Sequence, residues 1–186
     1  MRYLTCLCCT LFFIWGFQVN IVMAATQDPA SFEEAAKQGD VRSQVVMAMS
    51  YLYGSTENPK NKTKAVYWLQ KAADQGDVFA LNTLGVMYAK GDGVPQSYTK
   101  AAQLFKKGVE QGDASAQSNL GRMYCRGLGV IQDKQKGSEL LRTAAEFYLK
   151  RSGELEGNTT LEKGTRTVFE QQYESIVDEY NKYCTK

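Results

Sequence analysis

The sequence predicts an all-α fold, a right-handed superhelical solenoid of helix–turn–helix repeats closed by a C-terminal capping helix. Two observations predict it. Short motifs recur with a period of about 36 residues, and the apolar residues inside each period have the spacing of an amphipathic helix. The chain has 186 residues, of which 44% are hydrophobic and 23% charged, as in an ordinary globular protein.

Two motifs define the repeated unit. The first is Gln-Gly-Asp, whose glycine is found at three places: Gly39, Gly76 and Gly112. The second is a lysine that opens the second half of each unit: Lys64, Lys100 and Lys136. Because these anchors are independent and share one period, they indicate hairpins that bury their apolar faces only by stacking on one another.

The N-terminus has the features of a secretory signal peptide spanning residues 1–25. Arg2 precedes an apolar core at residues 4–17, and cleavage after Ala24 or after Ala25 fits the small residues that follow. An uncleaved membrane anchor is the alternative, although such a helix needs about 20 predominantly apolar residues. We expect a bacterial protein that is periplasmic or secreted, without stable membrane insertion after cleavage.

Residues 26–40 are predicted to form an N-terminal half-repeat cap. Its helix is expected from Phe32 to Gln38, opened by a capping box in which Ser31 and Glu34 satisfy each other's backbone amides. Three complete repeats are expected to follow, with these bounds: residues 41–76, 77–112 and 113–151.

The repeat at residues 77–112 shows how each hairpin is expected to form. Three apolar residues share one helical face: Ala80, Leu84 and Tyr88. Gly85 lies beside this face, where the missing side chain allows a neighbouring helix to approach closely. Gly91 ends the first helix, because glycine adopts the left-handed closing conformation without strain. A second helix is then expected from Lys100 to Glu110.

Residues 152–186 are predicted to form a linker and the C-terminal capping helix. The linker is the polar stretch at 152–159, and an apolar helical stripe follows: Phe169, Tyr173, Ile176, Val177, Tyr180 and Cys184. We expect this stripe to cover the open end of the third repeat, since solenoids need capped ends for solubility. The alternative is that the stripe docks a helix of a partner.

Cys125 and Cys184 are the two cysteines outside the predicted signal peptide. An even pair in an exported protein predicts one disulfide between them. The alternative is two unpaired thiols, one buried and one in a frayed terminus. Two cysteines without a histidine cannot make a metal site, and we predict no metal, cofactor or catalytic site.

The repeat motifs resemble those of the Sel1-like family, relatives of the tetratricopeptide solenoids. The resemblance rests on the pattern between Ala80 and Pro95, on Gln75-Gly76-Asp77 before it and on Lys100-Ala101 after it, and it covers about residues 32 to 147. The first copy departs from the pattern, because residues 54–59 replace the double-glycine turn. The resemblance implies a protein-binding adaptor, with envelope assembly, host interaction or immunity against an envelope-targeting effector as its roles.

Composition excludes several other functions. The chain has no histidine, so it has no Ser-His-Asp triad, no Cys-His pair and no imidazole base. A net charge of +2 argues against a nucleic-acid partner. Ser97-x-x-Lys100 matches a penicillin-recognising signature, which makes β-lactam binding or weak β-lactamase-like activity the alternative function. Helix capping by Ser97 and the periodic lysine place give a simpler explanation.

Residues that vary between repeats on the first helix of each hairpin are the predicted partner-binding surface. They are Val45, Met49, Tyr53, Phe79, Asn82, Val86, Lys90, Arg122 and Arg126. If these helices line the concave face, it is apolar at one end and basic at the other, and it suits a segment with apolar anchors and an acidic end. The alternative is that the apolar members contact neighbouring helices and the arginines are solvated. The predicted function is therefore that of a non-enzymatic scaffold for protein–protein interaction. The sequence leaves its oligomeric state open.

Overall fold

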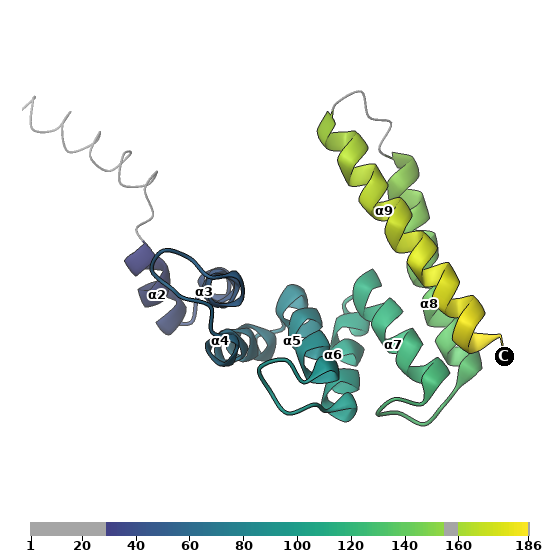
Figure 1. The fold of residues 1–186 in the computed structure, drawn as a ribbon, viewed down its shortest axis with the longest axis horizontal. Coiled ribbons are helices and arrows are strands. Elements are labelled where there is room, and N and C mark those ends of the chain that lie inside the picture. Colours follow the sequence, from purple (N-terminus) through teal and green to yellow (C-terminus); the bar gives the residue numbers. More distant parts are fainter. Residues whose placement is uncertain (1–28, 155–159, 186) are drawn as a thin grey trace, which may run out of the picture.

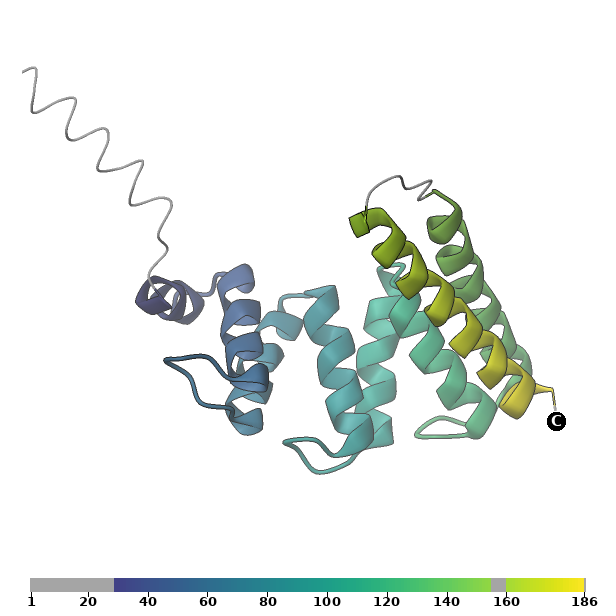
Figure 2. The same cartoon turned by 45° about the horizontal axis from the view of Figure 1, so that its top comes forward.

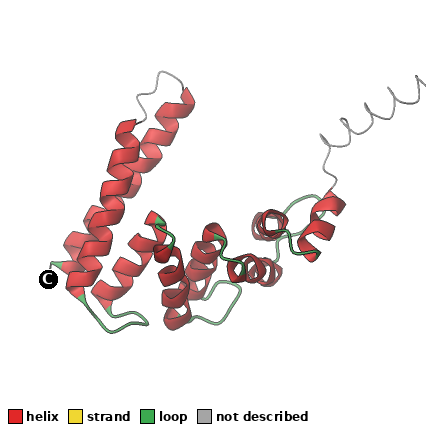
Figure 3. Ribbon diagram, turned by 180° about the vertical axis from the view of Figure 1, so that it is seen from behind, coloured by secondary structure: helices red, strands yellow, loops and turns green. Residues whose placement is uncertain are grey.

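The structure is a computed structural model that describes residues 29–154 and 160–185, and every regular element in these two stretches is helical. The elements are α2 (Pro29–Lys37), α3 (Val41–Tyr53), α4 (Lys62–Asp74), α5 (Val78–Lys90), α6 (Tyr98–Glu110), α7 (Ala114–Arg126), α8 (Lys134–Glu154), α9 (Thr160–Glu179) and a terminal π-helical turn, η1 (Tyr180–Cys184). They form a curved row of hairpins (Figures 1 and 3), which confirms the predicted all-α solenoid. The signal peptide predicted at residues 1–25 lies outside the described residues.

The Gln-Gly-Asp motif ends one hairpin and starts the next. Its aspartate caps the first helix of the following hairpin in all three copies, accepting a hydrogen bond from a backbone amide. The pairs are Asp40 with Ser43 at 2.7 Å, Asp77 with Ala80 at 2.7 Å and Asp113 with Ala116 at 2.6 Å. Side-chain capping satisfies amides that the helix itself leaves without a partner.

The glutamine of the motif joins neighbouring hairpins. Gln75 Nε2 donates to the carbonyl oxygen of Gly39 at 3.1 Å, and Gln111 Nε2 donates to that of Gly76 at 2.9 Å. Each bond therefore links one closing motif to the closing motif of the preceding unit. The sequence showed the glutamine only as a periodic marker, without this role.

Helices within a hairpin pack closely where the first helix has a glycine. A Cβ atom added to Gly85 would lie 2.6 Å from Cε1 of Phe105, and one added to Gly121 would lie 2.9 Å from Cγ of Leu141. Both distances are shorter than atoms tolerate, so the expected close approach at Gly85 is confirmed. Gly91 also ends α5 in the left-handed conformation, with a φ of 73°, as expected.

The start of the first described helix differs from the prediction. Helix α2 begins at Pro29, not at Phe32, and it ends at Lys37. Proline fits the first helical position, since its missing N–H would have no partner there. Ser31 therefore lies within the helix rather than at its N-cap, and its side chain falls outside the described residues, whereas Glu34 Oε1 accepts a hydrogen bond from Gln38 Nε2 at 3.2 Å.

Helix α8 is longer than predicted. It continues to Glu154, so residues 152–154 belong to the helix rather than to the expected linker, and Ser152 is buried. The reason is visible in the third repeat, where Phe147, Tyr148 and Leu149 stand in the places of Gln-Gly-Asp. Without a closing glycine the helix continues, and the α8–α9 pair extends beyond the shorter hairpins (Figure 2).

Helix α9 lies back along α8 and caps the third repeat, as predicted. Ile176 is 3% exposed in a cluster with Leu141 and Tyr148, and Phe169 and Tyr173 pack against the same cluster. The other stripe residues, Val177 and Tyr180, line a groove between the two helices. Within the described stretches we find no helix with both the length and the hydropathy to cross a membrane.

Candidate functional site

The first helix of each hairpin lies on the inner side of the curved row. Figure 1 shows this at the N-terminal end, where α3 lies inside the bend and α4 lies outside it. At the other end, α7 is the first helix of its hairpin, and the end of α9 contacts it through the Glu179–Arg122 pair. We call the surface formed by α3, α5 and α7 the inner face.

The charges on the three repeat helices of the inner face have one sign. Their charged residues, apart from the capping aspartates, are Arg42, Lys90, Arg122 and Arg126. None of these three helices contains an aspartate or glutamate within its bounds. The inner face therefore presents cationic and apolar groups together, although the net charge of the whole chain is only +2.

The predicted apolar residues of this face divide into two groups. Tyr53 and Phe79 are 76% and 45% exposed, and Met49 is half-buried. Val45 and Val86 are also half-buried, but they pack against the core clusters of the first and second hairpins. For these two valines the structure therefore has the helix contacts that the alternative interpretation expected.

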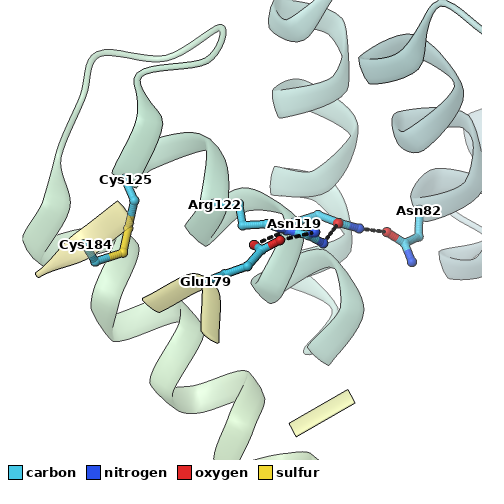
Figure 4. A network of polar contacts seen from close by, with 6 residues as sticks. All are labelled: Asn82, Asn119, Arg122, Cys125, Glu179 and Cys184. Atoms are coloured by element: carbon cyan, nitrogen blue, oxygen red, sulfur yellow. Dashed lines mark hydrogen bonds and ion pairs between the residues drawn. A yellow bond between two sulfur atoms is a disulfide. The ribbon is translucent and has the colours of Figure 1, made fainter. Parts of the chain in front are cut away.

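A chain of polar contacts connects two of the predicted residues across the inner face (Figure 4). Asn119 Nδ2 donates to Asn82 Oδ1 at 2.8 Å, and Arg122 Nη2 donates to Asn119 Oδ1. The other edge of Arg122 holds the carboxylate of Glu179, with Nε–Oε2 and Nη1–Oε1 distances of 2.9 Å each. The Nη1–Oε1 contact is a hydrogen bond, whereas the Nε–Oε2 contact is an ion pair without hydrogen-bond geometry.

The chain's own C-terminus covers the predicted basic end of the face. Cys184 forms the predicted disulfide with Cys125, with a Cα–Cα distance of 5.2 Å (Figure 4). The guanidinium of Arg126 lies 4.8 Å from the centre of the Tyr183 ring. Arg122 and Arg126 therefore contact residues 179–184, which we call the strap, and neither is simply solvated. By closing a loop with a sequence separation of 59, the disulfide stabilises the segment from α7 to η1 by roughly 4 kcal/mol.

Sequence reasoning missed an apolar notch beside the start of α7. It has a volume of about 460 Å³, and its lining includes Ser115, Tyr148, Phe169, and the half-exposed Phe147 and Val168. Ser115 Oγ and Tyr148 OH lie 2.7 Å apart, which fixes the wall of the notch against α7. The replacement of Gln-Gly-Asp by Phe147-Tyr148-Leu149 was the signal that could have revealed it.

Ser97 and Lys100 have structural contacts. Ser97 Oγ accepts a hydrogen bond from the backbone amide of Lys100 at 3.3 Å, as a helix cap does. The Lys100 ammonium lies 5.1 Å from the centre of the Tyr88 ring, and the other hairpins repeat this pair: Lys64 with Tyr51 at 5.1 Å and Lys136 with Tyr124 at 4.7 Å. The motif is thus one copy of a repeated cation–π contact. Among the described residues, no group of three acidic or cysteine side chains could hold a metal ion.

A family model described as Sel1 repeat matches the chain three times, at residues 41–77, 78–113 and 114–146. The chain belongs to the Sel1 repeat family. Sel1 repeat proteins typically mediate protein–protein interactions, so an inner face that presents cationic and apolar groups fits a protein partner.

Two solved Sel1 repeat structures are similar to this chain. A Sel1 repeat protein from Oxalobacter formigenes is 29% identical, with a TM-score of 0.59, and the match covers 76% of this chain and 98% of that one. A protective antigen of uropathogenic Escherichia coli, which displays an SLR fold, is 28% identical, with a TM-score of 0.63. That match covers 81% of this chain, which spans only 33% of the Escherichia coli protein.

Proposed function

We propose that this Sel1 repeat protein is an exported, non-enzymatic scaffold that binds a segment of a partner protein along its inner face. The observation that carries the proposal is the combination on α3, α5 and α7 of exposed apolar side chains with cationic groups, without an acidic residue inside these helices. A surface of that kind favours an acidic segment and disfavours a basic one, because like charges across an interface are costly.

The apolar anchors of the partner would meet the inner face in its middle. Phe79 is 45% exposed there, Met49 is half-buried on the preceding hairpin, and the apolar notch offers a cavity of about 460 Å³ beside α7. Buried aromatic contacts of this type carry most of the free energy in protein interfaces. Acidic groups of the partner would lie near Lys90 and Arg42, which are exposed on the same layer.

Export of the protein rests on the signal-peptide features of residues 1–25. A protective antigen among the similar proteins and a disulfide in this chain agree with an oxidising location outside the cytoplasm. In that location the roles we propose are immunity against an envelope-targeting effector or adaptor in an envelope assembly. Mass spectrometry of the protein from the producing bacterium should show a mature chain that begins after Ala24 or Ala25, and a full-length cytoplasmic chain would contradict export.

Site-specific photo-crosslinking tests the binding face. A photoreactive phenylalanine analogue replaces Phe79 on the inner face in one sample and Tyr67 on α4 in the other. Both side chains are aromatic and exposed, at 45% and 55%, so they differ mainly in the layer from which they project. We expect one defined adduct in cells from position 79 and none from position 67.

Two results would contradict the proposed function. Equal adducts from both positions, or an adduct from position 67 alone, would remove the inner face as the binding surface. Turnover of nitrocefin by the purified protein, abolished by Ser97→Ala, would show the enzymatic alternative to be correct. We expect no turnover, because the Ser97 hydroxyl and the Lys100 side chain are already engaged in the contacts of a helix cap and a cation–π pair.

A further inference from the structure

The strap contacts α7 at three neighbouring side chains of one helical face. Glu179 pairs with Arg122 and Cys184 is bonded to Cys125 (Figure 4). Tyr183 lies against Arg126. These contacts place the strap over the two arginines that the inner face has on its third hairpin. The question is what holds the strap there.

Noncovalent contacts hold the strap only weakly. The last buried residue before it is Ile176, and η1 has no buried residue; only its half-buried Tyr183 and Cys184 pack against the core cluster of α7, α8 and α9. The Arg122 and Glu179 side chains are 35% and 26% exposed, and ion pairs within reach of water contribute little. Terminal turns without buried side chains fray readily. The disulfide is therefore the contact that fixes η1 against α7.

The strap also occupies the groups that would bind an acidic ligand. Glu179 accepts a hydrogen bond from Nη1 of Arg122 and lies 2.9 Å from Nε, so it occupies a side of the guanidinium that an incoming carboxylate would approach. Asn119 engages the third nitrogen of Arg122, which keeps the guanidinium pointed towards the strap (Figure 4). A tethered carboxylate of this kind acts at a high effective concentration, so a partner in solution competes poorly with it.

We propose that the strap is a disulfide-latched cover of the basic end of the inner face, and that an acidic helical segment of a partner binds Arg122 and Arg126 once the disulfide is reduced. The proposal rests on the proposed function of the inner face. The reductant is a dithiol. Its thiolate attacks Sγ of the half-buried Cys184, Cys125 leaves as a thiolate and takes up a proton, and the second thiol then releases Cys184 as the reductant becomes a disulfide.

The partner segment should resemble the strap in chemistry. Glu179 and Tyr183 are one helical turn apart, as are Arg122 and Arg126, so the two pairs match in spacing. We therefore expect a helical segment with a carboxylate followed one turn later by an aromatic ring. A synthetic peptide that copies residues 174–185, with Cys184→Ser and a fluorescent label, is the probe for this chemistry.

Hydrogen exchange tests the latch without any partner. The full-length mature protein is compared in three states: oxidised, reduced with dithiothreitol, and as the Cys184→Ser variant. We expect the amides of residues 180–185 to exchange at least about tenfold faster without the disulfide, while α4 and α6 keep their rates. Unchanged rates in residues 180–185 would overturn the latch, and faster exchange throughout the chain would show the disulfide to be a general stabiliser instead.

Fluorescence anisotropy of the labelled peptide tests whether the site at Arg122 and Arg126 binds a segment of this chemistry. We expect Cys184→Ser to bind the peptide at least about tenfold more tightly than the oxidised protein, and Glu179→Gln in the same background to tighten binding further, because both remove the competing strap. Arg122→Ala in the Cys184→Ser background should abolish the gain, whereas Lys71→Ala on α4 should leave it unchanged.

The binding and crosslinking experiments distinguish a failure of this proposal from a failure of the proposed function. Equal affinity of the oxidised protein and Cys184→Ser for the peptide, or no binding to either, would overturn the proposal that reduction opens a binding site at Arg122 and Arg126. The crosslink from position 79 could still form in that case. Gated peptide binding without a crosslink from position 79 would instead remove the partner-binding role of the middle of the inner face. Because the first experiment needs no partner and the second uses a defined peptide, each failure has its own signature.

Discussion

The side chain of Asp40 caps the start of α3 and also makes the stability of the protein depend on pH under acidic conditions. Two hydrogen bonds from Ser43 hold the pKa of the Asp40 carboxyl below its usual value of 3.8. The bond from its hydroxyl has the larger effect and the bond from its backbone amide the smaller one. The folded protein therefore keeps this carboxylate charged at a pH where the unfolded chain takes up a proton. The capping contribution is complete above the unfolded pKa and is lost as the pH falls through the lower, folded value.

Asp40→Asn should make stability less sensitive to acid. Asparagine caps helices about as well as aspartate, but it does not titrate. We expect the free energy of unfolding of the variant to fall less steeply than that of the original protein as the pH drops below about 4. Urea unfolding followed by circular dichroism at a series of pH values measures this slope. Parallel slopes would mean that the Asp40 cap contributes nothing to acid sensitivity.

Gly85→Ala should destabilise the second hairpin. The added methyl group would lie 2.6 Å from the ring of Phe105, so the helices must separate or the ring must leave its position. Overpacking of this kind costs about 1–3 kcal/mol in the free energy of unfolding. Gly153→Ala is the matched control, because its Cβ meets nothing within 4 Å near the end of α8. That change should stabilise the protein by up to about 1 kcal/mol, and equal effects at both sites would exclude close packing as the cause.

At the scale of elements, α8 exposes apolar side chains on two different surfaces. Phe147 is 47% exposed in the notch of the inner face, whereas Leu149 is 54% exposed and lines the groove on the other side of the α8–α9 pair. Phe147 shares the notch with the exposed Val168, and contiguous exposed apolar groups of this kind mark interaction sites, whereas a single exposed apolar residue does not.

Phe147→Gln should therefore weaken partner binding without unfolding the protein. We expect its free energy of unfolding to change by no more than about 0.5 kcal/mol, as is usual for exposed sites, while the yield of the photo-crosslink from position 79 falls severalfold. Leu149→Gln is the control, since it removes a similar apolar surface from the same helix. A crosslink yield that falls equally in both variants would remove the notch from the binding surface.

Elements with a periodic signal were predictable from the sequence, and those fixed by unique contacts were not. Gly91 recurs as Gly127, and the ends of α5 and α6 at Lys90 and Glu110 were predicted correctly. Helix α6 begins at Tyr98 rather than at the expected Lys100, because Ser97 caps it. Helix α8 ends later than predicted because Tyr148 replaces the closing glycine and packs against Ser115, a contact that no repeat announces. The pairing of Arg122 with Glu179 was missed for the same reason, because α9 is not a copy of the other first helices. The disulfide was predictable because chemistry, rather than period, singled out Cys125 and Cys184.

At the scale of the whole molecule, the uneven placement of charge has more effect than its small total. The chain has 22 basic and 20 acidic residues, yet α3, α5 and α7 contain only basic ones within their bounds. Acidic residues lie instead on other elements, such as Glu33 on α2, Asp74 on α4 and Glu174 on α9. The charge within α3, α5 and α7 is therefore positive while the whole protein is close to neutral, and such a local charge speeds the approach of an acidic partner.

Lys90→Glu and Lys71→Glu change the net charge equally but on different layers. Lys90 is exposed on α5 at the inner face, and Lys71 is exposed on α4, the second helix of its hairpin. We expect Lys90→Glu to lower the association rate of the crosslinked partner by on the order of tenfold at low ionic strength, because it places a negative charge where the partner's acidic residues approach. Lys71→Glu should change this rate little. The difference should vanish towards ~1 M salt, where the screening length is about 3 Å. Surface plasmon resonance with the purified partner measures both rates, and equal losses in the two variants would mean that net charge, rather than the inner face, controls the encounter.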